Sequence, residues 1–406
     1  MPNKIEKFFF FLAVCLLCLS PSAYAFHNGG VADCQACHTM HNSKDGAVVA
    51  TGGGLSSALI VATDPSSVCL NCHSGPGSFN SYHVSSPDGS AMTPGGDFYW
   101  LKKTFTWSGG SSPGNTHGHN IIARDYGFTA DSYRSTAPWG SYPAASLGCN
   151  SCHDPHGSTN GGTANSNPPV SGSGSYGEPA PAGTTRGNYR LLGGTGYNGG
   201  DASLGNSFSN AAPIALQNFI RPFGETDTSH VDYGSNMSEW CANCHTDILT
   251  NEHQNSSSNF EHPSGNNEGL EDYVDTYNQY VKTGDMSGSR GTAYFALIPF
   301  ERGESDVNLL DPAGTLGPDS ASNLMCLTCH RAHASAFKFV GRWDFAAELL
   351  IDSHPAATDA GVTGNDVLYS FYGRDMITEF GASQRILCEK CHQVPKDGYP
   401  DFGGGP

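Results

Sequence analysis

The chain has 406 residues, with 38 acidic and 20 basic residues and a formal net charge of −18 at pH 7. This negative surface repels nucleic acid and anionic membranes, so neither is expected as a partner. Only 14% of the residues are charged, and 51 Gly with 24 Pro predict a chain rich in extended loops.

The N-terminus has the three parts of a secretory signal. Lys4 and Lys7 provide the basic start, Phe8–Leu19 is a short apolar run, and Ala23-Tyr24-Ala25 is a cleavage site of small residues. The run is too short to span a bilayer, which takes about 20 apolar residues. We therefore expect residues 1–25 to be removed during export through the periplasm, leaving 26–406 as a single domain.

Two of the 14 cysteines, Cys15 and Cys18, lie in this signal. They follow Val14 and Leu17, whereas a lipidated cysteine normally follows Gly or Ala, so we do not expect a lipid anchor.

The other twelve cysteines form six Cys-x-x-Cys-His motifs and none is left over. The cysteine pairs, in chain order, are Cys34 and Cys37, Cys69 and Cys72, Cys149 and Cys152, Cys241 and Cys244, Cys326 and Cys329, and Cys388 and Cys391. The adjoining histidines are His38, His73, His153, His245, His330 and His392.

This spacing is typical of covalent attachment of haem c. Two thiols three residues apart bond the two vinyl groups of one porphyrin, and the adjacent histidine becomes the proximal ligand of the iron. A single copy is also compatible with half a zinc site, a redox dithiol or a disulfide. A zinc site needs its ligands in fours, however, and a dithiol has no reason to carry histidine after every second cysteine. The sequence therefore predicts six haem c groups.

Each iron needs a sixth ligand or an open position, and eleven histidines remain outside the motifs. We expect histidine rather than methionine on the second face, which sets lower redox potentials. His41, His156 and His333 each follow a proximal histidine by three residues. On a helical turn such residues share one face, so the second histidine cannot ligate the opposite side of the same iron. It must serve a neighbouring haem, unless it is a solvated surface histidine.

Three more histidines, His83, His119 and His262, complete a set of six distal ligands. His117 is an alternative to His119, and His27 beside the mature N-terminus is a further candidate. The remaining His230, His253 and His354 are interpreted as ordinary polar residues.

Between the motifs, regular structure is sparse. Helical patterns cover Met237–Leu249, Glu268–Lys282, Ser322–Phe337 and Thr378–His392. The segment Gly157–Gly187 consists mainly of Gly, Ser, Thr, Pro and Asn. Neither alternating strands nor a Gly-rich nucleotide-binding turn is present. We expect a multihaem cytochrome c, mostly loop with a few short helices and very little strand, wrapped around a continuous haem chain that forms the apolar core.

Several segments resemble a known family. They include His27-Asn28-Gly29-Gly30, Met92-Thr93-Pro94-Gly95-Gly96-Asp97-Phe98, His117-Gly118-His119-Asn120-Ile121, Met237-Ser238-Glu239-Trp240-Cys241 and Tyr372-Gly373-Arg374. With all six motifs in order, the chain is similar to the hexahaem outer-surface cytochromes of metal-reducing bacteria over nearly its whole mature length. It departs from them at Ser158–Arg186 and in the tail Pro395–Pro406.

The resemblance implies alternating parallel and T-shaped haem pairs, all ligated by two histidines. It also implies a filament in which His41 of one protomer ligates the fifth haem of the next. The expected function is extracellular electron transfer, from outer-membrane or periplasmic cytochromes to metal oxide or an electrode, without an enzymatic active site, although direct reduction of extracellular metal is compatible.

Two alternatives remain open. One is a monomeric electron shuttle. The other is a multihaem reductase of an oxyanion such as nitrite, which requires a vacant iron face; no Cys-x-x-Cys-Lys motif is present to mark such a haem.

Overall fold

The computed structural model describes residues 34–39, 41, 43–44, 47–48, 59–79, 81–155, 189–200, 207–217, 224–249, 264–385 and 387–392. Several predictions fall outside these residues: the signal, the segment 158–186 and the tail 395–406. His27, His156, His253 and His262 also lie outside them.

Helices in the described part are short, and most of the motifs form a single turn. The α-helices are α2 Cys34–Cys37, α3 Pro65–His73, α4 Cys149–Cys152, α5 Met237–Cys241, α6 Val274–Gln279, α7 Cys326–Cys329, α8 Asp366–Ser370 and α9 Met376–Phe380. The sixth motif lies on a 3-10 turn, η12 Leu387–Lys390. Asp64 caps α3 by accepting the Ser67 N–H at 2.8 Å, and Pro65 occupies its first turn.

The four predicted helical ranges are longer than the helices observed. The range 322–337 contains only the four residues of α7, because His330 takes an extended backbone (φ −110°, ψ 162°) and ends the helix. His153 ends α4 in the same way (φ −103°, ψ 132°). The proximal histidine therefore leaves the helix, which a periodicity of apolar residues does not reveal.

Strands are few, and all pair antiparallel within the described residues. They form three two-stranded sheets: β1 Ser43–Lys44 with β2 Ala47–Val48, β3 Phe105–Trp107 with β4 Gly110–Ser112, and β5 Ile214–Gln217 with β6 Val231–Ser235. The last pair has a register shift between Ile214 and Ala215.

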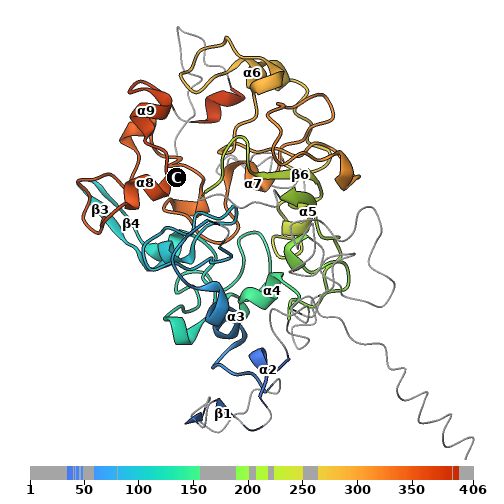
Figure 1. Cartoon of the computed structure of the whole chain (residues 1–406), viewed down its shortest axis with the longest axis vertical. Helices are drawn as coiled ribbons and strands as arrows, with labels where there is room; N and C mark the ends of the chain where they lie inside the picture. Colours follow the sequence, from blue (N-terminus) through green and yellow to red (C-terminus); the bar gives the residue numbers. More distant parts are fainter. Residues whose placement is uncertain are drawn as a thin grey trace, which may run out of the picture.

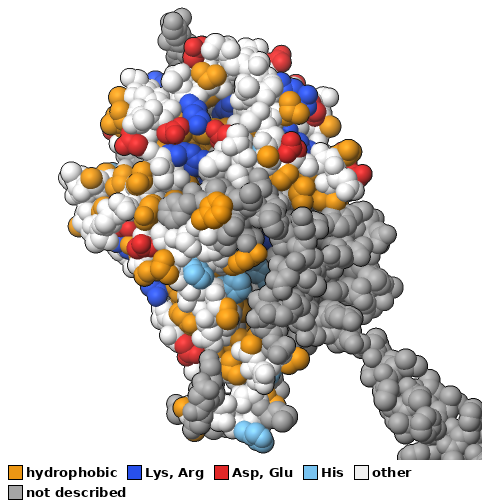
Figure 2. Space-filling view, in the orientation of Figure 1, with side chains coloured by type: hydrophobic (Ala, Val, Ile, Leu, Met, Phe, Trp, Pro, Cys, Tyr) orange, Lys and Arg blue, Asp and Glu red, His pale blue; other side chains and the backbone are white. Residues whose placement is uncertain are grey.

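Figure 1 shows α2, α3, α4, α5 and α7 following one another along the long axis of the molecule in chain order, with α2 and β1 at one end. Buried apolar residues form several separate clusters around this row instead of one core. On the face drawn in Figure 2, hydrophobic and charged side chains are interspersed. None of the helices in the described part has the length and apolar character needed to cross a membrane.

Candidate functional site: a cavity lined by the cysteine motifs

One large cavity runs through the molecule. Its volume is ≈ 2560 Å³, whereas ordinary ligand pockets are about 300–1,000 Å³. The residues that line it include every cysteine and every histidine of the six motifs. Leu70, Phe98, Ile298 and Leu327, from three different apolar clusters, also line it. The clusters therefore border the cavity and do not fill it.

The cysteines place the six motifs in a linear order along the cavity. Cys37 of the first motif interacts electrostatically with Cys72 of the second. Cys69 of the second motif lies beside Cys149 of the third, and Cys152 of the third lies close to Cys244 of the fourth.

The same pattern continues to the end of the chain. Cys241 of the fourth motif lies beside Cys326 of the fifth. Cys329 then interacts electrostatically with Cys388 and Cys391 of the sixth. Each motif thus adjoins the next one in the sequence.

Two of these junctions share one construction, which we call the paired turn. In the first paired turn, the buried hydroxyl of Ser66 on α3 accepts the Cys149 N–H of α4 at 3.0 Å. In the second, Ser238 on α5 accepts the Cys326 N–H of α7, also at 3.0 Å. Each serine stands three residues before the first cysteine of its own motif, and each binds the first N–H of the next motif helix.

Two histidine pairs face each other across the cavity. The ring centres of His119 and His245 are 6.1 Å apart, and those of His153 and His333 are 6.2 Å apart. A metal bonded to an imidazole nitrogen on each side, at about 2 Å per bond, puts the ring centres roughly 6 Å apart. Both pairs therefore have the spacing for two axial ligands of one iron, and His333 lies opposite a motif other than its own.

A close backbone contact positions both distal histidines. His119 N–H donates to the His333 carbonyl at 2.9 Å, and Ser335 N–H donates to the His117 carbonyl at 2.9 Å. Gly118 lies between them, where a Cβ would stand 2.3 Å from the His333 oxygen. Only glycine allows this approach, so the His-Gly-His sequence is a requirement of the packing.

Nδ1 of His333 has no partner in the described structure, but six other candidate ligands share an orienting hydrogen bond. In each, the ring Nδ1 donates to a backbone carbonyl, which leaves Nε2 free for a metal and fixes the ring orientation, as in metal-ligating histidines generally. The bonds are His73 to Tyr82 (3.0 Å), His83 to Pro76 (2.7 Å), His119 to Ala332 (2.7 Å), His153 to Arg190 (2.8 Å), His245 to Pro138 (2.8 Å) and His330 to Phe339 (2.8 Å).

Burial keeps these imidazoles in the state that binds metal. Desolvation lowers the pKa of His153 and of His245 to about 4 and that of His333 to about 3. A metal ligand must be neutral histidine, so no proton has to be displaced at neutral pH.

His117, the alternative to His119, has both ring nitrogens in use. Its Nδ1 donates to the Trp100 carbonyl at 2.9 Å, and its Nε2 lies 2.7 Å from the Ser112 hydroxyl. Its side chain is fully buried and does not line the cavity. This geometry favours His119 as the ligand.

The other predicted distal ligands are not brought to the cavity in this way. His41 is exposed on the segment between α2 and β1, and His83 lies next to Gly75 without lining the cavity. Since His156 and His262 lie outside the described residues, their roles stay predictions. His354, interpreted as an ordinary polar residue, pairs its Nδ1 with Asp359 at 2.6 Å and stacks on Trp107.

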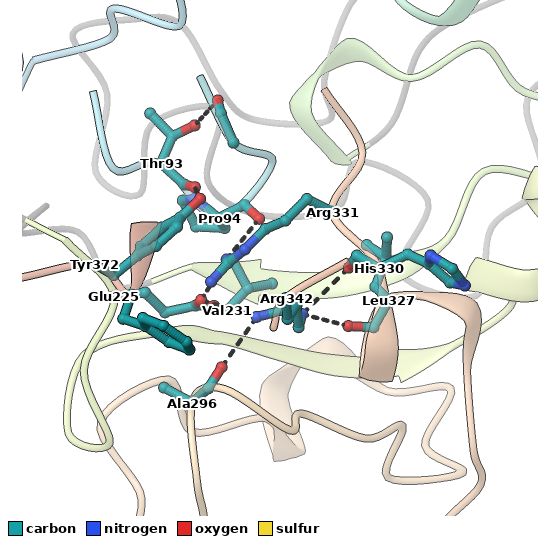
Figure 3. Close-up of polar contacts among 12 residues, drawn as sticks. Thr93, Pro94, Glu225, Val231, Ala296, Leu327, His330, Arg331, Arg342 and Tyr372 are labelled. Carbon is teal, nitrogen blue, oxygen red and sulfur yellow. Dashed lines mark hydrogen bonds and ion pairs between the residues drawn. The ribbon is translucent and has the colours of Figure 1, made fainter. Parts of the chain in front are cut away.

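A buried ion cluster beside the fifth motif was not anticipated from the sequence. Figure 3 shows Glu225 between Arg331 and Arg342, with ion-pair distances of 2.7 and 3.1 Å, and the Arg331 guanidinium stacks 3.6 Å from the Tyr372 ring. Although burial opposes it, the two arginines hold the pKa of Glu225 below its usual value. The position of Arg331, directly after His330, was the one available signal.

The charges of this ion cluster indicate whether the cavity lining is chemically suited to haem. The cluster combines two guanidinium groups with one carboxylate, and Arg331 lines the cavity with its Nε and Nη2 atoms buried and unpartnered in the described structure. Buried cations require anionic partners, and the carboxylate side chains of a porphyrin are such partners. By contrast, no group of three or more His, Cys, Asp or Glu suited to a bare metal ion occurs among the described residues. The motif residues, the apolar walls and Arg331 therefore fit haem.

The comparisons with known proteins agree with this geometry. No family model matches the chain. The chain is 41% identical to the C-type cytochrome OmcS of Geobacter sulfurreducens over 423 aligned positions, covering 94% of this chain and 96% of that protein.

Two solved structures match as well, an outer membrane cytochrome S filament and OmcS nanowires, both from Geobacter sulfurreducens. Their TM-scores are 0.70 and 0.72, at 38% identity, covering 90% of this chain and 99% of each matched chain. The expectation of a mostly loop multihaem cytochrome with few short helices is thereby confirmed. The chain belongs to the OmcS family of c-type cytochromes, electron-transfer proteins with covalently attached haem c.

Proposed function

We propose that this protein conducts electrons outside the cell along six haems, each held between two histidines, and that it does so as a filament of its own copies. The observation that carries the proposal is the single cavity lined by all six motifs. Because each motif adjoins the next, a chain of six cofactors has no gap between the first motif and the last.

Haem supplies an iron that gains and loses one electron at a time. The residues of the chain anchor, orient and shield it. In each motif the two cysteines form the covalent anchors and the adjacent histidine presents Nε2 to the iron. The apolar clusters around the cavity keep water away, which together with axial ligation sets the redox potential.

The proposed axial pairs follow from the ring geometry where it is described. His245 pairs with His119 and His153 with His333. His83, His156 and His262 then remain within the chain for the motifs of His38, His73 and His392. This leaves the iron at His330 without a second histidine from its own chain.

We assign that position to His41 of a neighbouring protomer. His330 meets the edge of the Phe345 ring at 5.6 Å, and no histidine ring faces it among the described residues. His41 is exposed at the end of the molecule that carries α2 and β1 (Figure 1). The filaments formed by the similar OmcS structures support self-assembly.

The rest of the proposal concerns cellular context. The signal 1–25 directs export through the periplasm, and 26–406 forms one hexahaem unit at the cell surface. Outer-membrane or periplasmic cytochromes donate electrons, and metal oxides or electrodes accept them, with direct reduction of metal at an exposed haem edge.

Electron microscopy and optical spectroscopy of the secreted protein test this proposal. We expect filaments, six haems per chain by haemochrome assay, and a low-spin spectrum unchanged by carbon monoxide or nitrite. Dispersed single particles with the same spectrum would instead indicate a shuttle. A haem that binds nitrite in the assembled protein would indicate a reductase.

A further inference from the structure

His230, immediately before β6, is a buried histidine that faces the cavity. Its side chain is 2% exposed and it is one of the lining residues. The ring stacks on Tyr294 with centres 3.7 Å apart, and the backbone N–H donates to the Pro312 carbonyl at 3.0 Å. Both the ring and the backbone of His230 are therefore held in place.

Both ring nitrogens of His230 lack a hydrogen-bond partner in the described structure. A neutral imidazole always carries one N–H donor, and a buried donor left unpaired destabilises the folded state. His117 shows the usual solution, because both of its nitrogens are bonded to protein atoms. The partner of His230 must therefore come from whatever occupies the cavity.

His230 does not have the construction of an axial ligand here. Six candidate ligands donate Nδ1–H to a backbone carbonyl, and His230 makes no such bond. His333 also lacks it, but its ring faces His153 at the spacing of an axial pair, whereas the ring of His230 stacks on Tyr294. That bond is what fixes the tautomer and leaves Nε2 for the metal. With neither this bond nor a histidine ring facing it among the described residues, His230 is suited to hydrogen bonding.

The surrounding charges favour an anionic ligand. Glu225 interacts electrostatically with His230; its Oε2 is held by Arg331 and Arg342, and its Oε1 has no partner in the described structure. The other two acidic neighbours are also paired, Asp232 with Arg302 at 2.8 Å and Asp227 with Lys282 at 3.1 Å. Arg331 also lines the cavity with unpartnered N–H groups, so the donors around the unfilled space outnumber the acceptors.

We propose that His230 binds a haem carboxylate, donating its ring N–H to a propionate of the haem attached through the fifth motif. The link to that motif runs through Glu225, which interacts electrostatically with His230 and is paired with Arg342. Arg342 in turn donates to the carbonyls of Leu327 and His330 in the fifth motif. The inference rests on the proposed function, since it requires haem in the cavity. It makes His230 a positioning residue that also adjusts one redox potential through hydrogen bonding.

The test uses the full secreted protein with two substitutions. His230→Phe keeps a ring to stack on Tyr294 but removes both nitrogens, whereas His230→Gln keeps an N–H donor. His354→Gln is the control, because His354 does not line the cavity. Resonance Raman spectroscopy of the propionate bending bands and spectroelectrochemical titration are measured on each, after six low-spin haems have been verified in the unsubstituted protein.

In His230→Phe we expect one propionate band to shift and one of the six midpoint potentials to fall, with a spectrum that stays low-spin. The potential falls because a carboxylate without its donor stabilises the ferric state. His230→Gln should restore both values in part, and His354→Gln should change neither. Unchanged bands and potentials in His230→Phe would overturn the inference, and a high-spin haem would make His230 an iron ligand instead. Fewer than six haems in the unsubstituted protein would refute the proposed function separately.

Discussion

Individual histidines in this protein differ in the hydrogen-bond partners of their ring nitrogens. His119 places Nδ1 on a backbone carbonyl and faces His245, whereas its near neighbour His117 has both nitrogens engaged by protein atoms. Burial lowers the pKa of His117 to about 4, so it stays neutral in both of its hydrogen bonds. We therefore expect separate roles for the two residues, His119 toward haem and His117 in packing.

This difference predicts opposite results for two alanine variants. His119→Ala should turn one haem high-spin with little change in haem content. His117→Ala should keep all haems low-spin but lower the free energy of unfolding by about 2–4 kcal/mol, because it leaves the Trp100 carbonyl and the Ser112 hydroxyl unpaired. Optical spectra and thermal unfolding of both variants measure the two effects. High-spin haem in His117→Ala would reverse the assignment.

Glu301 predicts a pH dependence of stability. Its side chain is fully buried; Oε1 accepts the Met237 N–H at 2.6 Å, and Oε2 has no partner in the described structure. Burial raises the pKa of Glu301 from 4.5 to about 8. Between pH 4.5 and about pH 8, Glu301 is protonated in the native state but ionised in the unfolded chain. Its protonated form therefore contributes fully to the free energy of unfolding below pH 4.5, and this contribution is lost as the pH rises toward 8.

Glu301→Gln removes this titration while keeping the acceptor for Met237. We expect the variant and the parent to be similarly stable at about pH 4, and the variant to be more stable at about pH 8, by on the order of a few kcal/mol. Melting temperatures across this range measure the difference. If the two profiles run parallel, Glu301 is ionised in the folded protein.

At the scale of elements, the paired turn joins consecutive motifs into two-motif units. α3 with α4 and α5 with α7 are built alike, with a serine hydroxyl receiving the first N–H of the following helix and the first cysteines side by side. The remaining junctions in the described part use electrostatic proximity of cysteines without that serine. Two kinds of junction therefore alternate from the second motif to the fifth. The alternation of parallel and T-shaped haem pairs stays a prediction.

Removing either serine hydroxyl leaves a buried helix N–H without its acceptor. Ser66→Ala and Ser238→Ala should each lower the free energy of unfolding by about 1–2 kcal/mol. The two losses should add in the double variant because the sites are separate. Thermal unfolding measures them, with exposed Ser111→Ala as a control expected to have almost no effect. A loss no larger than the control's would mean that the paired turns are held by other contacts.

For the whole molecule, the cavity replaces a conventional core. Protein interiors are close-packed, and an apolar space of ≈ 2560 Å³ cannot persist empty. The chain produced without covalent haem attachment should therefore lack a cooperative unfolding transition and be digested rapidly by protease. Calorimetry and limited proteolysis of haem-free and haem-loaded protein provide the comparison. A cooperative transition in the haem-free chain would show that loops and small clusters suffice.

Assembly belongs to the same scale, and His41 is its test. His41→Ala should keep six haems but abolish filaments and turn one haem high-spin, because the position opposite His330 loses its ligand. Val48→Ala, on the same exposed end, is the matched control and should polymerise normally. Electron microscopy and optical spectra measure both outcomes. Normal filaments from His41→Ala would defeat the assignment across the protomer boundary.

Six haem attachment motifs can be recognised in the sequence because each needs only five consecutive residues, and the excess of glycine and proline already indicated loops. The helices came out shorter than predicted, since the backbone of His153 and His330 leaves the helix where the apolar pattern continues. Which histidines face each other was beyond sequence reasoning. His119 meets His245, and His153 meets His333, through contacts between segments far apart in the chain.

The same reason explains His230 and the Glu225 cluster. Nothing next to His230 in the sequence marks it as a cavity residue, and Glu225 meets Arg331 and Arg342 only when loops from distant parts of the chain pack together. Covalent haem attachment depends on residues that are adjacent in the sequence, so the sequence alone predicts it. The order of the motifs, the choice of His119 over His117 and the charges beside the fifth motif depend on long-range packing, which requires the folded chain.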